Sequence, residues 1–215
     1  MRVHLAILVV LQLIMGVELV LLFYERLWIN AVVVMAIMAI TLSPAALGRR
    51  FSVNILPEFQ VLAVVFVFAA LYLGEVRSYY ERIWWWDIAL HTSSGLLTGV
   101  FGFLLVYVLN ESDRVELQMR PRFVALFAFL FAVVVGTLWE IFEFSMDQLA
   151  GTVMQKPMLG DPSGLTDTMW DMIVNALGAL VMSTLGWWYM IRGELSFIES
   201  WIRKFIVRNP RLFRY

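Results

Sequence analysis

The sequence contains no cysteine and few charged residues, and both shortages narrow what the protein can be. Without cysteine, disulfide bonds, thiolate metal sites and cysteine nucleophiles are excluded. Charged residues make up 15% of the chain, compared with about 25% in an ordinary soluble domain. The formal net charge is only −1, so the chain has no basic field that would attract nucleic acid.

Apolar residues fill the space that charged residues leave. They form 61% of the chain, above the roughly 45–50% of a soluble domain. Crossing a bilayer takes about 20 apolar residues, and six segments approach or reach that length. They are Val3–Phe23, Trp28–Leu47, Pro57–Leu73, Ile88–Leu109, Phe123–Phe144 and Trp170–Ile191. We therefore predict an all-α, polytopic transmembrane bundle of about six helices over residues 1–192.

The residues after the last apolar segment have a different pattern. Apolar residues recur at helical spacing from Ile198 to Ile206, and basic residues from Arg203 to Arg208 occupy the other flank. This pattern is typical of an amphipathic helix that lies on a membrane surface. Residues 193–215 are accordingly predicted as a cytoplasmic amphipathic helix and tail, with membrane lipids as partners.

Basic residues are unevenly distributed over the connections. If both termini share one side, only Arg26, Arg77, Arg82 and Lys156, of 16 Lys and Arg residues, fall on the opposite side. Cytoplasmic connections carry the excess of Lys and Arg. This distribution predicts that both termini are cytoplasmic.

Three groups of polar residues interrupt the apolar segments near their ends. The groups are Asp87 with His91, Glu140 with Glu143 and Asp147, and Asp167 with Asp171 and Asn175. Spacings of three, four, seven or eight residues place each group on one helix face. With alternating helix directions, all three groups reach the extracytoplasmic boundary, so we expect them to meet there. Glu18, near the outer end of the first segment, is a further candidate.

A bound cation is the simplest explanation for such a cluster. An ionised carboxylate facing hydrocarbon costs at least about 2.5–3.5 kcal/mol, so these groups should face a protein or water-filled interior. Their mutual repulsion is relieved by a divalent metal ion, and oxygen ligands with one imidazole suit Mg²⁺, Mn²⁺ or Ca²⁺ and can also hold Zn²⁺ or iron. The predicted metal ligands are Asp87, His91, Glu140, Glu143, Asp147, Asp167, Asp171 and Asn175.

Individual members of the cluster also have simpler interpretations. Carboxylates near a membrane boundary are often solvated, and Asp167 can cap the last segment in competition with Thr166 or Thr168. The connection from Ser145 to Met169 is rich in glycine and proline, which predicts an irregular loop. That loop can act either as a lid over the cluster or as an ordinary linker.

The polar runs resemble those of a known family. The runs W-x-D-x-x-x-H at Trp85–His91, G-T-x-W-E-x-x-E-F-x-x-D at Gly136–Asp147 and D-T-x-x-D-x-x-x-N-x-x-G at Asp167–Gly178 resemble the YjdF-like family of bacterial inner-membrane proteins. The ordered set is also distantly similar to VanZ-like proteins. The resemblance implies a helical fold in the bacterial inner membrane, and it implies no particular activity.

Three functions fit the cluster. The first is a metal-dependent hydrolase or transferase that acts on a lipid or other envelope substrate, with Glu143 or Glu140 as the catalytic general base. The second is an accessory or structural subunit, with other membrane-protein subunits as partners. The third is a cation- or proton-linked transporter, although the cytoplasmic halves of the segments offer few polar residues for a path.

Overall fold

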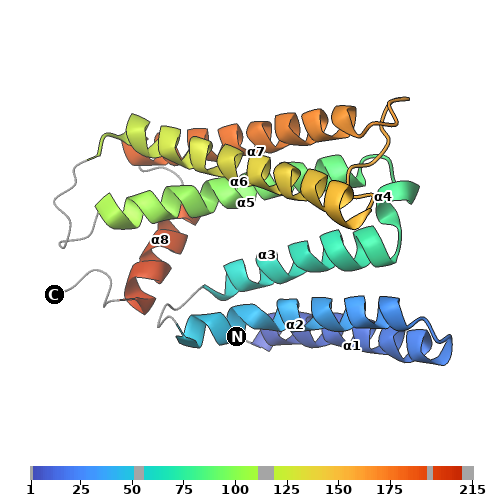
Figure 1. Cartoon of the computed structure of the whole chain (residues 1–215). Helices are drawn as coiled ribbons and strands as arrows, with labels where there is room; N and C mark the ends of the chain where they lie inside the picture. The colour runs from blue at the N-terminus through green and yellow to red at the C-terminus, as the bar shows by residue number, and fades with distance from the viewer. Residues whose placement is uncertain (1, 51–55, 111–118, 193–195, 210–215) are drawn as a thin grey trace. The chain divides into compact units, whose positions relative to one another are not determined.

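The computed structural model describes residues 2–50, 56–110, 119–192 and 196–209, and the regular elements there are helical (Figure 1). The elements are α1 (Arg2–Tyr24), α2 (Trp28–Arg50), α3 (Pro57–Val67), the π-helix η1 (Phe68–Val76), α4 (Tyr79–Arg82), α5 (Trp86–Asn110), α6 (Pro121–Ala150), α7 (Leu165–Arg192) and α8 (Ser196–Arg208). The prediction of an all-α membrane helical protein is confirmed.

Five helical stretches among the described residues are long and apolar enough to cross a membrane. They are Leu5–Tyr24, Pro57–Val76, Trp86–Val106, Pro121–Ala150 and Leu165–Arg192. The predicted second segment forms most of α2, but its apolar run within the described residues is the shorter Asn30–Leu42. A crossing by α2, and with it the count of six, stays a prediction.

The described chain separates into two compact units. One comprises the described residues up to Trp86 together with Val207–Asn209, and the other comprises those from Asp87 to Ile206. Helix α8 occupies much of the tail that was predicted to be an amphipathic helix. The placement of that helix on a membrane, and the division of the chain at residue 192, stay predictions.

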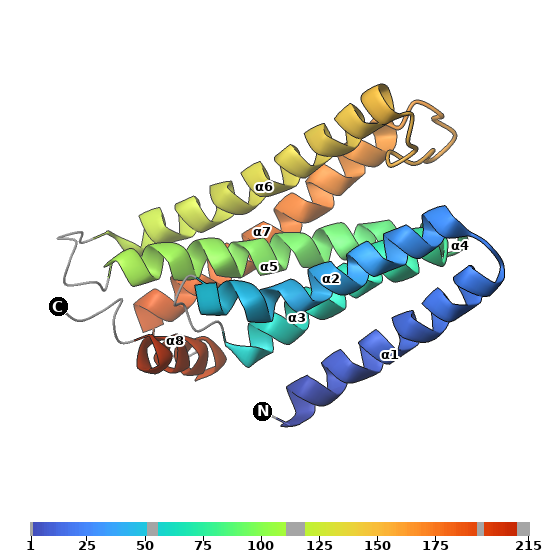
Figure 2. The ribbon, with the colours of Figure 1, turned by 60° about the horizontal axis from the view of Figure 1, so that its bottom comes forward.

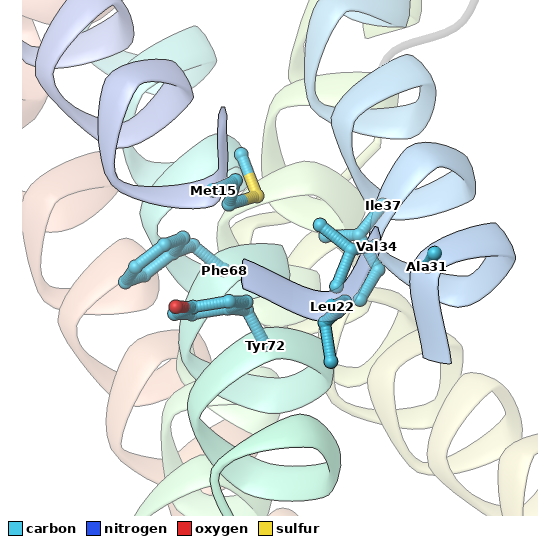
Figure 3. Close-up of a cluster of buried hydrophobic side chains, with 7 residues drawn as sticks. All are labelled: Met15, Leu22, Ala31, Val34, Ile37, Phe68 and Tyr72. Carbon is cyan, nitrogen blue, oxygen red and sulfur yellow. The ribbon is translucent and has the colours of Figure 1, made fainter. Parts of the chain in front are cut away.

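The first unit has an apolar core between α1, α2 and η1. Figure 3 shows the buried side chains of this core. They are Met15 and Leu22 from α1, Ala31, Val34 and Ile37 from α2, and Phe68 and Tyr72 from η1. These residues are three, four or seven apart within each element, so each element turns one face inward.

Two sets of polar contacts connect elements of the first unit. Gln12 Nε2 donates a hydrogen bond of 2.7 Å to Thr41 Oγ1, which joins α1 to α2. The carboxylate of Glu18 lies 3.2 Å from Arg77 Nη1 and accepts a hydrogen bond of 3.4 Å from the Tyr72 hydroxyl. Glu18, the further candidate for the cluster, is therefore held by a cation of its own unit.

In the second unit, α6 and α7 run side by side and are joined by the loop 151–164 (Figures 1 and 2). Pro121 begins α6, where its missing amide hydrogen costs nothing, and Gly151 ends it in a left-handed conformation (φ 64°). The buried residues of α6 form one stripe, namely Val124, Ala128, Ala132, Gly136, Glu140 and Glu143. This stripe starts small and apolar and ends in two carboxylates beside the loop.

Candidate functional site

The imidazole of His91 brings the predicted polar groups together within the second unit. Its Nε2 atom lies 3.3 Å from Asp87 Oδ1, one turn earlier on α5, and 3.9 Å from Asp171 Oδ2 on α7. One ligand atom from each of Asp87, His91 and Asp171 lies within 4.8 Å of the other two. The expected convergence of α5 and α7 is therefore present.

Helix α6 reaches the other side of the same imidazole. Glu140 Oε1 lies 3.5 Å from His91 Nδ1. The two ring nitrogens thus face different partners, because Nδ1 faces α6 while Nε2 faces Asp87 and Asp171. This difference separates Glu140 from the other two carboxylates.

Two carboxylates of the site are buried. Glu140 is 4% exposed and Asp171 is 1% exposed, and neither oxygen of Asp171 accepts a hydrogen bond from the described residues. A buried carboxylate with no donor carries a large desolvation penalty unless a proton or a cation compensates it. The orphaned oxygens and the adjacent imidazole therefore fit a divalent cation.

Glu143 lies one turn beyond Glu140 on the buried stripe of α6. The indole Nε1 of Trp139 donates a hydrogen bond of 2.8 Å to Glu143 Oε1, and this contact spans four residues of the same helix. The structure thus distinguishes two acids that spacing alone could not separate. Glu140 faces the histidine, and one oxygen of Glu143 is held by a tryptophan.

Asp147 and Asp167 bind the loop between α6 and α7. Asp147 accepts hydrogen bonds from Thr152 Oγ1 and from the backbone amides of Met154 and Gln155, at 2.6, 2.7 and 2.9 Å. Asp167 Oδ2 accepts one of 2.7 Å from the amide of Lys156. These carboxylates therefore hold the loop against the ends of both helices, and this role is structural.

Asp161 is a polar residue of this region that sequence reasoning left out of the site. It accepts hydrogen bonds from the amide and hydroxyl of Ser163 and from those of Thr166. These bonds hold the pKa of the Asp161 carboxyl well below its usual range. Asp161, rather than Asp167, thus supplies the cap at the start of α7, and the Asp-Pro-Ser turn sequence before that helix was the available signal.

Asn175 lies one turn further along α7 than Asp171 and is 2% exposed. With its amide oriented to satisfy both neighbours, it donates to the Ala132 carbonyl and accepts from the Gly95 amide, at 3.3 Å each. Both partners belong to the backbones of α5 and α6. The amide therefore bridges helices in this orientation.

Long apolar helices, three of which carry a buried to half-buried cluster of carboxylates and histidine, define an integral membrane protein with a polar site. The chain belongs to the family of predicted membrane proteins described as DUF2238, which matches residues 4–192. It is also similar to a Thermotoga maritima protein described as an uncharacterized protein, with 31% identity over 119 residues. That match covers 55% of this chain and 56% of the relative, so the chain spans about half the length of the curated protein it matches. No solved structure matches the chain.

Proposed function

We propose that the protein binds a divalent metal ion at Asp87, His91 and Asp171. The observation that carries the proposal is the approach of their three ligand atoms to within 4.8 Å of one another, at a place where both oxygens of Asp171 lack hydrogen-bond donors in the described part of the chain. Two carboxylates and an imidazole suit Mn²⁺, Zn²⁺ or iron, and more weakly Mg²⁺ or Ca²⁺.

Glu140 then has a supporting role. A histidine that binds a metal through one nitrogen usually donates its other N–H to a carboxylate, which fixes the tautomer and orients the ring. Glu140 faces Nδ1, so Nε2 is directed toward the two aspartates. The contacts of Asp147, Asp167 and Asn175 similarly favour roles outside the set of ligands.

The proposed ligand set would leave open coordination positions on the metal. Three protein ligands leave coordination positions for water or substrate, which is the arrangement of catalytic rather than structural metal sites. We therefore favour a hydrolase or transferase that acts on a lipid or envelope substrate, with Glu143 as the general base. In this arrangement Trp139 holds Oε1 of Glu143 and leaves Oε2 for proton transfer.

Elemental analysis of the detergent-purified protein, before and after loading with Mn²⁺, Zn²⁺, Mg²⁺ or Ca²⁺, tests the metal site. We expect about one equivalent in the wild type and loss of that metal in Asp87→Ala and His91→Ala. Asp161→Asn is the matched control, because it removes a carboxylate outside the cluster. Absence of metal from loaded wild-type protein, or equal loss in the control, would contradict the site.

Turnover tests the proposed reaction separately. A bacterial lipid extract is incubated in proteoliposomes with wild-type protein or Asp171→Asn, and the products are followed by mass spectrometry. Metal-dependent conversion by the wild type alone would support an enzyme. A bound metal without conversion would instead favour the accessory subunit.

We also propose that the site opens to the outer face of a bacterial inner membrane with both termini cytoplasmic. The charge distribution supports this orientation, and the resemblance to the YjdF-like family supports the inner-membrane location. The chain lacks cysteine, so Val153→Cys in the loop and Arg122→Cys at the opposite end of α6 introduce unique labelling sites. An impermeant maleimide added to whole cells should label the first and not the second, and the reverse pattern would invert the protein.

A further inference from the structure

A second layer of contacts lies one helical turn from the proposed metal site. His91, Glu140 and Asp171 belong to α5, α6 and α7. Each has a partner four residues away on its own helix, namely Gly95 on α5, Gly136 on α6 and Asn175 on α7. Four residues make about one turn of an α-helix, a rise of roughly 6 Å. Each helix therefore carries one site residue and one residue of this second layer.

The second layer is in direct contact around Asn175. A methyl group added at Gly136 would lie within 2.6 to 2.9 Å of the side-chain amide atoms of Asn175. One added at Gly95 would collide with the backbone carbonyl oxygen of Asn175. The Asn175 side chain therefore fills the space that the missing side chain of Gly136 leaves, and α5 approaches the α7 backbone at Gly95.

The helix backbones also touch on the other side of this layer. A methyl group added at Gly178 would collide with the Thr92 carbonyl oxygen and lie 3.1 Å from the Leu96 amide. Glycines at a helix interface allow such close approach in membranes, where packing and interhelical hydrogen bonds drive association. Any rotation of α5 or α7 would break several of these contacts together.

We propose that Asn175 is a positioning residue which, with Gly95 and Gly136, sets the rotation of α5, α6 and α7 so that His91, Glu140 and Asp171 meet. This inference rests on the proposed metal site and revises the prediction that Asn175 is a metal ligand. In the orientation that satisfies both neighbours, the Asn175 amide donates to the Ala132 carbonyl and accepts from the Gly95 amide, one on each neighbouring helix. A small rotation of one of these helices about its own axis would separate His91, Glu140 and Asp171, which lie one turn away.

Asn175→Asp separates a positioning residue from a ligand, because the two roles predict opposite results. A carboxylate binds divalent metals at least as well as an amide, so a ligand role predicts unchanged or higher affinity for Mn²⁺ and Zn²⁺. A positioning role predicts a loss of about tenfold or more, since aspartate cannot donate to Ala132. Unchanged or higher affinity would overturn the proposal.

Gly136→Ala provides a second variant that leaves every ionisable group in place. We expect its added methyl group to displace the Asn175 amide and to weaken Mn²⁺ and Zn²⁺ binding by about tenfold or more. Gly186→Ala is the matched control, because its methyl group would lie 2.5 Å from Phe103 at the other end of the α5–α7 contact. It should lower the melting temperature without changing metal affinity, and an equal loss of affinity in both variants would refute the role.

A measurement without metal distinguishes failure of this inference from failure of the metal site. Spin labels at Leu105→Cys on α5 and Leu126→Cys on α6 report the separation of the two helices in chelator-treated protein. We expect one narrow distance distribution that broadens in Gly136→Ala and in Asn175→Asp. An unchanged distribution would overturn the positioning role, whether or not the wild type binds metal.

Discussion

Replacing Asp171 by asparagine should stabilise the metal-free protein and should reduce the stabilisation that added metal provides. Asp171 is 1% exposed, its Oδ2 lies 3.9 Å from His91 Nε2, and neither oxygen accepts a hydrogen bond from the described residues. An asparagine side chain has the same shape as aspartate, carries no charge and has an NH₂ group that can donate to the neighbouring carboxylates. Without metal we expect Asp171→Asn to be more stable than the wild type by about 1–3 kcal/mol, the usual cost of a buried unsatisfied polar group.

With metal, the difference should shift by about 2.3 kcal/mol in favour of the wild type, which inverts the order wherever the metal-free difference is smaller than that. A ligand present at 100 times its dissociation constant stabilises the folded state by about 2.7 kcal/mol. If the variant binds about 100-fold more weakly, the same metal concentration stabilises it by only about 0.4 kcal/mol. At about 2–4 °C per kcal/mol for a chain of this size, the metal-induced rise in melting temperature should be about 5–9 °C smaller in the variant.

The assay is thermal unfolding in detergent, followed by the fluorescence of the nine tryptophans, with and without chelator and added metal. Asp161→Asn serves as the control, because it removes a carboxylate of the loop and should keep the full metal-induced shift. An identical metal-induced shift in wild type and Asp171→Asn would refute a coordinating role for Asp171. If Asp171→Asn without metal is less stable than the wild type, the inference that the Asp171 charge destabilises the metal-free protein is wrong.

Three further perturbations test the loop and the first unit. Asp147→Ala removes three hydrogen bonds, so we expect faster hydrogen exchange in loop 151–164 and a smaller change in metal affinity than in Asp171→Asn. Because folding lowers the pKa of Asp161, its contribution to loop order is fully present above about pH 3.9, the pKa in the unfolded chain, and is lost as the pH falls through the lower pKa of the folded state. Hydrogen exchange at the amides of Ser163 and Thr166 would follow this loss. Thr41→Val removes the acceptor of Gln12 and should destabilise the first unit by about 0.6–1.7 kcal/mol in thermal unfolding, with metal affinity unchanged.

The helices themselves follow from local properties of the sequence. Length and hydropathy predicted the segments that became α1, α5, α6 and α7, with ends that differ by a few residues, because an apolar run of this length satisfies its backbone hydrogen bonds within the helix. The predicted segment Pro57–Leu73 is less regular, since the chain winds as an α-helix to Val67 and as a π-helix from Phe68. Hydropathy contains no signal for that change of winding.

Spacing also identified which residues face inward. Glu140, Glu143, Asp167, Asp171 and Asn175 are all buried, as residues on common helix faces should be. Their division into roles was not predictable in the same way. Asp147 and Asp167 have the same chemistry as Asp171, yet their oxygens accept hydrogen bonds from the loop, while those of Asp171 accept none from the residues that the structure describes.

The sequence by itself determined a helical membrane protein with polar faces near the ends of three helices. Only the tertiary structure decided that His91 presents one nitrogen to Glu140 and the other to Asp87 and Asp171. The physical reason is that helical period places a residue on a face, while the partner of that face depends on the rotation and separation of neighbouring helices. Contacts such as that between Gly136 and Asn175 set this rotation, and they form between residues far apart in the chain.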